Sequence, residues 1–318
     1  MMESRLRIFT GNANPQLAHD IAGGLDMEVS DALVGAFKNG ESRVRLDENV
    51  RGCDVFMVQS TCMPVNHSLM ELLFMIDAAR RASAKKITAV VPYYGYAKQE
   101  KKTTGREPIS AKLVANMIAT AGADRLVAVD LHAPAIEGFF DIPVDHLRAA
   151  PLLVDHFKQE DLSDAVVVSP DAGGVLRAND FRQRIGVPLA IIAKQRPRPD
   201  EAEIMDMVGD VKGKTAIIVD DLVSTGGTLT EAAEMLIDKG ARRVWVAATH
   251  AAWVGSPAAT EARKLLTNSW IERIVITDTI QVPPDERNEK IQIVSVASLL
   301  GEAIMRIHKD LSVSALFH

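Results

Sequence analysis

Short apolar runs separated by polar segments recur along the whole chain. Each run is mainly Val, Ile, Leu and Ala, and it is continuous rather than alternating with polar residues. Runs of this kind are too short for a helix and are typical of strands buried on both faces of a mostly parallel sheet. We expect strands within residues 6–11, 54–61, 87–95, 125–133, 165–174, 188–196, 215–227, 243–251 and 273–279.

Apolar residues at helical spacing occupy several of the segments between these runs. In residues 66–82 they recur every three to four positions, and Asn66 is expected to cap the start of that helix. We expect further helices at Ser110–Ala121, Thr228–Lys239 and Pro257–Thr267. Strands that alternate with helices over the whole length predict an α/β protein in which helices flank a mostly parallel sheet.

The length of 318 residues predicts two domains, since one domain commonly holds about 150 residues. A fresh series of strands and helices begins after residues 147–151, which leaves two halves of similar length and similar alternation. We therefore place the first domain at residues 1–149 and begin the second at residue 150.

Composition narrows the class of protein. With 47% apolar and 25% charged residues the chain is neither disordered, collagen-like nor a coiled coil, and a formal charge of −6 argues against a protein that binds nucleic acid. Cys53 and Cys62 match no zinc or redox motif, which favours a reducing compartment. No apolar stretch is long enough to cross a membrane. We expect a cytoplasmic protein that binds no membrane.

The strongest chemical signal is the segment AIIVDDLVSTGGT at residues 216–228. A buried strand leads into two adjacent carboxylates, Asp220 and Asp221, and a loop that is rich in glycine and hydroxyl groups then precedes a helix. Glycines let several N–H groups point at one anion beside a helix N-terminus, while carboxylates accept hydrogen bonds from hydroxyls. This combination predicts a site for a sugar phosphate.

That segment resembles the phosphoribosyl-diphosphate loop of type I phosphoribosyltransferases. Other segments narrow the resemblance; they are FKNGESRVRL, PYYGYAKQEKK, DLHAPAIEGFFDIPVDHL, SPDAGG, KQRPRP and SVSALF. Together, in order and over essentially the full length, they resemble the ribose-phosphate diphosphokinases of the phosphate-activated bacterial and animal class. The resemblance implies two phosphoribosyltransferase-like domains, the second at residues 150–304, with a C-terminal tail, 305–318, that packs back on the first.

The resemblance also implies a reaction and its substrates. Members of this family transfer diphosphate from Mg-ATP to the anomeric hydroxyl of ribose 5-phosphate and release AMP. Ribose 5-phosphate would be bound by the strand end and loop, namely Asp220, Asp221, Ser224, Thr225, Gly226, Gly227 and Thr228. The family commonly has an aspartate where this chain has Ser224. Lys194 and Arg196 lie where the family has a mobile catalytic loop, and two cations there would stabilise the charge of the transferred group.

Other segments correspond to the nucleotide and metal sites of the family. ATP would be bound by Phe37, Asn39, Glu41, Lys98, Gln99 and His132, the first three acting on the base from an adjacent subunit. The family usually has arginine in place of Lys98, and lysine lacks the bidentate fork of arginine. His132 and Asp171 would help to hold Mg²⁺, for which an aspartate oxygen is a suitable ligand. We assign no such role to His19, His146, His156 and His308.

The C-terminal SVSALF corresponds to the regulatory site of the family, which takes phosphate as an activator and ADP as an inhibitor. The residues expected there are Arg51, Ser83, Arg106, Ser312, Ser314 and Phe317. The family forms hexamers, so we expect a homo-oligomer. Two alternatives stay open: a catalytically silent regulatory paralogue, and a phosphoribosyltransferase that uses a base as its acceptor.

Overall fold

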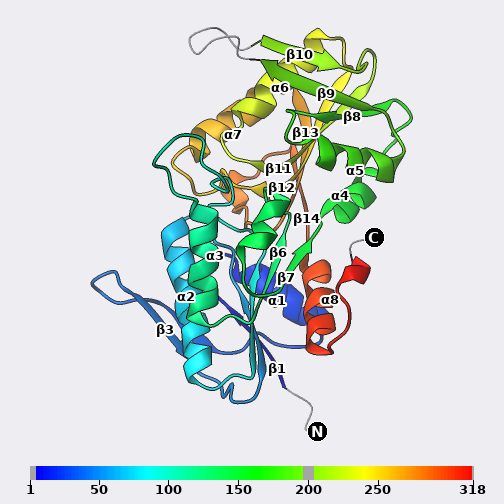
Figure 1. Ribbon diagram of the computed structural model, residues 1–318. Helices are drawn as coiled ribbons and strands as arrows, with labels where there is room; N and C mark the ends of the chain where they lie inside the picture. Colours follow the sequence, from blue (N-terminus) through cyan, green and yellow to red (C-terminus); the bar gives the residue numbers. More distant parts are fainter. Residues whose placement is uncertain (1–4, 196–203, 317–318) are drawn as a thin grey trace. The chain divides into compact units, whose positions relative to one another are not determined.

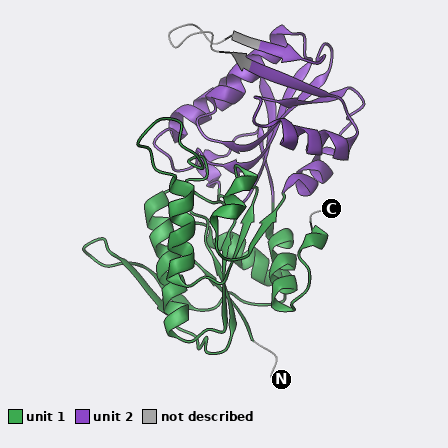
Figure 2. Ribbon diagram, viewed as in Figure 1, with its two compact units in different colours: residues 1–148, 279–281, 295–318 green, residues 149–278, 282–294 purple. Residues whose placement is uncertain are grey.

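The computed structural model describes residues 5–195 and 204–316. The chain divides into two compact units, shown in Figure 2. Unit 1 comprises residues 1–148, 279–281 and 295–318, and unit 2 comprises residues 149–278 and 282–294. Each unit is a mostly parallel sheet flanked by helices, so the α/β class expected from the periodicity is confirmed.

The sheet of unit 1 has five parallel strands in the order β1-β4-β5-β6-β7. They are β1 (Leu6–Thr10), β4 (Asp54–Val58), β5 (Lys86–Val91), β6 (Arg125–Val129) and β7 (Val144–Leu147). Every residue of β4 is buried, which is why its sequence is a continuous apolar run. The four helices of this unit are α1 (Pro15–Gly24), α2 (Val65–Arg81), α3 (Ser110–Ala121) and α8 (Ala297–His308).

These helices cover the sheet in two pairs. Helices α2 and α3 pack together on one side, and α1 and α8 pack together on the other (Figure 1). The buried stripe of α2 contains Leu69, Leu72 and Ile76, as helical spacing predicts. Its start differs from our expectation: Pro64 is the N-cap, while the Asn66 side chain accepts a hydrogen bond from the Tyr96 hydroxyl instead.

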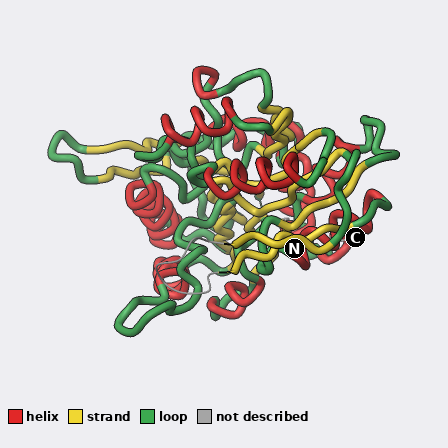
Figure 3. Tube along the Cα trace, turned by 90° about the horizontal axis from the view of Figure 1, so that it is seen from above, coloured by secondary structure: helices red, strands yellow, loops and turns green. Residues whose placement is uncertain are grey.

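A hairpin of two antiparallel strands, β2 (Ala32–Ala36) and β3 (Ser42–Leu46), extends from unit 1. Figures 1 and 3 both show it projecting beyond α2, on which β3 packs. Alternation of half-buried and exposed residues along β3 fits a strand with only one face covered. We did not expect this hairpin: β3 alternates polar and apolar residues, and the short apolar run of β2 is interrupted by Gly35.

The chain returns to unit 1 after unit 2, and it does so earlier than we expected. All of α8 belongs to unit 1, so unit 2 ends at residue 294 and not at residue 304. The reason is packing, because α8 buries Leu300, Ile304 and Ile307 and lies against α1. Two ion pairs then fix the end of α8 to the sheet: His308 Nδ1 lies 2.8 Å from Asp54 Oδ2, and Lys86 Nζ lies 2.8 Å from Asp310 Oδ1.

The sheet of unit 2 has seven strands in the order β10-β9-β8-β11-β12-β13-β14, of which only β10 runs antiparallel to its neighbour. They are β8 (Ala165–Ser169), β9 (Leu189–Gln195), β10 (Ile204–Val208), β11 (Thr215–Val223), β12 (Arg243–Ala251), β13 (Ile271–Thr277) and β14 (Ile291–Val294). The helices are α4 (Ala150–Phe157), α5 (Val175–Ile185), α6 (Gly227–Asp238) and α7 (Ala259–Asn268). Short 3₁₀ helices also occur: η2 (Pro284–Glu286) belongs to unit 2, whereas η1 (Pro134–Phe139) and η3 (Ser314–Leu316) belong to unit 1.

Aromatic rings join the helices of unit 2 to its sheet. Phe157 of α4 stacks on Trp245 of β12 with ring centroids 6.1 Å apart, and it meets Phe181 of α5 edge to face.

Within the part of the chain that the structure describes, no helix is long and apolar enough to cross a membrane.

The docking of α8 on unit 1 can be tested by removing one buried side chain. Ile304 is fully buried, so Ile304→Ala leaves a cavity and lowers the free energy of unfolding by about 2–4 kcal/mol. The measurement is denaturant-induced unfolding followed by circular dichroism. Glu302→Ala, on the exposed face of the same helix, is the control and changes stability by less than about 0.5 kcal/mol. Equal effects of the two substitutions would contradict this packing.

Candidate active site

Two adjacent aspartates form the centre of the candidate site in unit 2. Asp220 and Asp221 lie within β11, which continues to Val223, and not after its end as the sequence led us to expect. Asp221 is buried, with 4% of its side chain exposed, and Asp220 is 22% exposed. A pair of carboxylates at such a position needs a partner, because burial of unpaired charge is costly.

Arg177 is that partner, and sequence reasoning missed it. It lies in the first turns of α5, and its Nη1 is 3.1 Å from Asp220 Oδ1 and 3.2 Å from Asp221 Oδ1. One cation therefore faces two carboxylates. Burial and then the neighbouring charge of Asp221 raise the pKa of Asp220 to about 7, although Arg177 opposes the change. At neutral pH the pair can thus hold or release one proton.

The loop after β11 presents backbone N–H groups. Residues 224–226 form a bend, Gly226 is the N-cap, and α6 begins at Gly227. Gly226 has φ of 79°, and a Cβ there would lie 3.2 Å from Leu266 Cγ, so a larger residue would strain the turn. Thr225 and Thr228 are exposed beside it. A helix N-terminus that follows a glycine-containing turn is suited to bind a phosphate.

The neighbouring loop carries Asp171. It joins β8 to α5, and β8 is hydrogen-bonded to β11 in parallel, so both loops leave the same edge of the sheet. The exposed Asp171 accepts the Gly174 N–H at Oδ1, 2.8 Å away, and its backbone oxygen accepts the Ser169 hydroxyl. The Asp171 carboxylate is thereby held at the carboxyl edge of the sheet.

In unit 1, three of the residues assigned to ATP follow two adjacent parallel strands. Lys98 and Gln99 follow β5, and His132 follows β6. Lys98 and Gln99 are exposed and His132 is half-buried. The Gln99 side chain accepts a hydrogen bond from the Ser110 hydroxyl at the start of α3, which ties this loop to the helix.

His146, to which we assigned no role, supports the segment that carries His132. Burial lowers the pKa of His146, so the imidazole is neutral, and its Nε2 accepts the Leu131 N–H at 2.7 Å and Arg148 Nη1 at 2.9 Å. Nδ1 therefore carries the proton and donates to Glu137 Oε1. Leu131, Glu137 and His146 all lie in the segment DLHAPAIEGFFDIPVDHL, but its sequence does not show that these residues contact one another.

The remaining residues assigned to ATP lie at the tip of the β2–β3 hairpin. Phe37 is 50% exposed, with the Arg43 guanidinium 5.3 Å from its ring centroid, and Asn39 and Glu41 are exposed beside it. The turn is closed by hydrogen bonds from the Phe37 N–H to the Glu41 carbonyl and from the Glu41 N–H to Asn39 Oδ1. An exposed aromatic ring between polar groups is suited to stack on a flat base.

The two cations that we expect to act in catalysis are Lys194 and Arg196. Lys194 belongs to β9, paired with Met205 of β10, and Arg196 lies outside the described residues.

Four of the expected regulatory residues lie in unit 1 either just before β4 and β5 or just after α8. Arg51 and Ser83 precede β4 and β5, and the Gly52 N–H bonds to the Ser83 carbonyl. Ser312 and Ser314 follow the ion pairs that fix α8 to the same edge, and their hydroxyls are 2.6 Å apart. Arg106 is not with them, because it lies between β5 and α3 at the opposite, carboxyl edge of the sheet. Phe317 lies outside the described residues.

Comparisons with known proteins place this arrangement in a family. A model of the "N-terminal domain of ribose phosphate pyrophosphokinase" matches residues 6–122, and one of the "Phosphoribosyl synthetase-associated domain" matches residues 194–318. The ribose-phosphate pyrophosphokinase of Caldanaerobacter subterraneus is 54% identical over 313 residues, which are 98% of each chain. The chain belongs to the ribose-phosphate pyrophosphokinase family.

Other members of the ribose-phosphate pyrophosphokinase family agree with this assignment. The member from Gloeobacter violaceus is 50% identical over 318 residues, covering 100% of this chain and 94% of its own. The crystal structure of phosphoribosylpyrophosphate synthetase from Mycobacterium smegmatis matches with a TM-score of 0.90 and 45% identity, covering 96% of this chain and 100% of its own. The resemblance found in the sequence motifs and the fold class that it implied are confirmed.

The donors present are compatible with a magnesium ion that arrives with a nucleotide. Among the described residues, no cluster of three or more His, Cys, Asp or Glu side chains could hold a metal ion. Magnesium is commonly bound through one or two carboxylates together with substrate phosphates, and it needs no complete protein cage. The exposed Asp171 carboxylate is a hard oxygen ligand of the required kind.

The raised pKa of Asp220 predicts how stability depends on pH. The folded state holds the Asp220 proton up to about pH 7 and the unfolded state only to about pH 3.8, so the free energy of unfolding falls as pH rises between these values. The Asp220→Asn variant has no proton to lose at this position, so its free energy of unfolding does not fall for this reason. The stability of the variant relative to the wild type therefore rises across that interval, by up to about 4 kcal/mol, and is constant at higher pH.

Chemical unfolding at a series of pH values measures this difference. Asp210→Asn is the control, because the Lys212 N–H lowers the pKa of this exposed carboxyl and it stays ionised from pH 5 to pH 8. A relative stability of Asp220→Asn that does not change with pH would contradict the shared proton.

Proposed function

We propose that the protein transfers the terminal diphosphate of ATP to the anomeric hydroxyl of ribose 5-phosphate, giving 5-phosphoribosyl 1-diphosphate and AMP. The observation that carries the proposal is the combination of two carboxylates in β11 with the N-terminus of α6, which begins after a glycine-containing turn. Full-length similarity to enzymes named ribose-phosphate pyrophosphokinase supports it and does not favour a phosphoribosyltransferase that uses a base. It does not favour a silent paralogue either.

Ribose 5-phosphate is bound in unit 2. Its phosphate accepts hydrogen bonds from the loop of residues 224–228, including the hydroxyls of Ser224, Thr225 and Thr228 and the N–H groups of Gly226 and Gly227. Its ring hydroxyls donate to Asp220 and Asp221. Because Asp220 has a pKa of about 7, it accepts such a hydrogen bond fully only when it has lost its proton. Ser224 keeps a donor for the phosphate and contributes no negative charge.

ATP is bound by residues of unit 1. Lys98, Gln99 and His132 contact the phosphates from the carboxyl edge of the sheet, and Lys98 acts as a point charge without the fork of an arginine. Phe37 stacks on the adenine of an adjacent subunit while Asn39 and Glu41 bond to its edge. Asp171 and His132 would hold Mg²⁺, and the ion would supply positive charge against the phosphates.

The chemical step exchanges one P–O bond for another. The anomeric hydroxyl gives up its proton to solvent, and its oxygen bonds to the β-phosphorus of ATP as the bond between that phosphorus and the oxygen of the α-phosphate breaks. AMP then leaves with that oxygen. Negative charge grows on the oxygens around the β-phosphorus. Lys194 and Arg196 offset that charge, which is the largest contribution that side chains make to phosphoryl transfer.

Catalysis is tested by incubation with ATP, ribose 5-phosphate and Mg²⁺, with AMP and 5-phosphoribosyl 1-diphosphate measured by chromatography. We expect both products in equal amounts from the wild type. Lys194→Ala lowers kcat by about 100-fold to 1,000-fold and changes either KM by less than about threefold, because the lost charge acts in the transition state. Lys212→Ala, an exposed lysine of the same unit, is the control. Absence of both products from the wild type would overturn the proposed function.

We also propose regulation by phosphate as activator and ADP as inhibitor. Arg51, Ser83, Ser312 and Ser314 provide the amino-edge part of the anion site, to which Phe317 is assigned as well. Because Arg106 is at the other edge, a second copy of the chain supplies it, which requires a homo-oligomer; we propose a hexamer.

The two free, buried cysteines are compatible with a reducing, cytoplasmic location.

The regulatory site is tested by replacing one of its cations. Arg51→Ala raises the phosphate concentration for half-maximal activation by about tenfold, as loss of one charge-assisted contact implies. Activity at saturating phosphate stays close to that of the wild type. Arg81→Ala, an exposed arginine paired with Asp77, is the control. Phosphate activation that is identical in the wild type and Arg51→Ala would exclude this site.

A further inference from the structure

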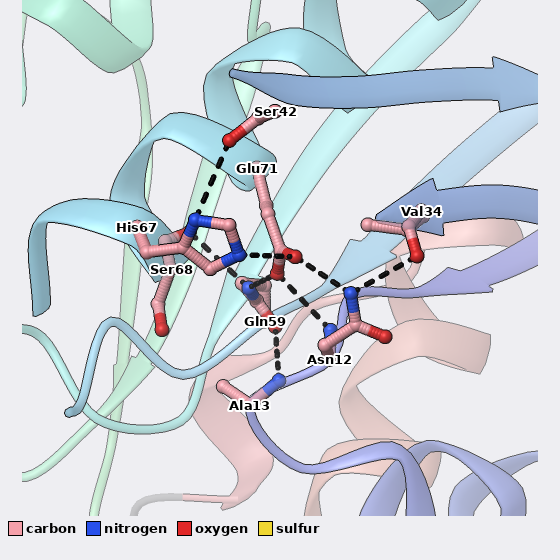
Figure 4. A network of polar contacts seen from close by, with 8 residues as sticks. All are labelled: Asn12, Ala13, Val34, Ser42, Gln59, His67, Ser68 and Glu71. Atoms are coloured by element: carbon pink, nitrogen blue, oxygen red, sulfur yellow. Dashed lines mark hydrogen bonds and ion pairs between the residues drawn. The ribbon is translucent and has the colours of Figure 1, made fainter. Parts of the chain in front are cut away.

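Unit 1 contains a buried carboxylate that the proposed reaction does not use. Glu71 lies in α2 with 1% of its side chain exposed (Figure 4). Its Oε1 accepts from Asn12 Nδ2 at 2.6 Å and from His67 Nε2 at 3.1 Å, and its Oε2 accepts from the Asn12 N–H at 3.2 Å and from Gln59 Nε2 at 2.8 Å. Each oxygen thus has two donors, so the hydrogen-bonding capacity of the carboxylate is fully used.

The donors themselves are held firmly. Gln59 follows β4; its Nε2 also donates to the Ser68 carbonyl, and its Oε1 accepts the Ala13 N–H. Gly11 leaves room for it, since a Cβ at Gly11 would lie 2.4 Å from the Gln59 side chain. The network therefore has little freedom to rearrange.

Two of these donors extend from Glu71 to the β2–β3 hairpin. The second N–H of Asn12 Nδ2 donates to the Val34 carbonyl of β2 at 3.1 Å. His67 Nδ1 lies 3.5 Å from the Ser42 hydroxyl of β3 (Figure 4). Each strand of the hairpin is thereby linked to the same buried carboxylate through one side chain.

The direction of the hairpin depends on these links. Ala32, Val34, Val44 and Leu46 pack at its base, whereas its tip projects beyond α2 and is exposed. Apolar packing is not directional, but a hydrogen bond to a strand carbonyl fixes both distance and angle. A small rotation at the base moves the projecting tip, which carries Phe37, by a larger amount.

We propose that Asn12 and His67, held by Glu71, are positioning residues that set the orientation of the β2–β3 hairpin and so the affinity of the enzyme for the adenine part of ATP. This inference rests on the proposed function, in which Phe37, Asn39 and Glu41 contact the base. It adds residues that touch neither substrate and that determine recognition of the nucleotide base.

Asn12→Asp tests the proposal with almost no change in shape. The variant puts a carboxylate where Asn12 Nδ2 donates to both Glu71 and Val34, so two bonds become repulsive contacts. We expect KM for ATP to rise about tenfold, which is the effect of a lost contact of about 1.4 kcal/mol. The KM for ribose 5-phosphate and kcat stay within about twofold. Inhibition by inorganic triphosphate, which has no base, is unchanged.

His67 supplies a second set of variants that tests the same network without adding charge. His67→Ala removes the donor to Glu71 and raises KM for ATP, while His67→Gln restores an N–H close to the position of Nε2 and recovers most of the affinity. Gln16→Ala is the control, because this exposed residue of the neighbouring helix α1 bonds only to Asp20 in the described contacts. Thermal unfolding of every variant shows whether the fold is retained.

The outcomes separate this inference from the proposed function. A wild type that forms no AMP overturns the proposed function, and this inference with it. An active wild type whose Asn12→Asp and His67→Ala variants keep their KM for ATP overturns the inference alone. Equal weakening of ATP and inorganic triphosphate also overturns it, because the effect would then not concern the base.

Discussion

Strands that are buried on both faces leave room for polar chemistry only near their ends, and this constraint organises both units. All residues of β4 and β8 are buried, and polar side chains appear where such strands meet loops. Since the strands are parallel, their loops meet at one edge of each sheet. Asp220 and Asp221 are the exception, because they lie inside β11, and they are tolerated there because Arg177 reaches them from α5.

Glu71 and the pair Asp220 and Asp221 differ in the partners that hold them. Glu71 has two donors on each oxygen and holds other parts of unit 1 in place. Asp220 and Asp221 share one guanidinium, and the pKa of Asp220 stays near 7. A carboxylate with two donors on each oxygen is suited to anchor structure, whereas a pair that can hold or release a proton near neutral pH is suited to receive hydroxyls from a ligand.

Net charge is a poor guide to a protein of this kind. The total of −6 argued against polyanionic partners, yet the family acts on phosphorylated substrates. Recognition of phosphate by backbone N–H groups at the start of α6 needs no net positive charge. A few cations at strand ends, such as Lys98, can serve the remaining phosphates without altering the total.

The sequence by itself determined the class of fold and the family, and it predicted a phosphate loop. Strands such as β4 and β11 are visible as local apolar runs, and the loop of residues 224–228 is one contiguous motif, so neighbouring residues carry the information. Tertiary structure decided what depends on distant residues: Arg177 facing Asp220, and α8 joining unit 1. It also separated Arg106 from Arg51 and linked the hairpin to Glu71. These contacts join residues far apart in the chain through isolated polar side chains, and local patterns contain no signal for such pairs.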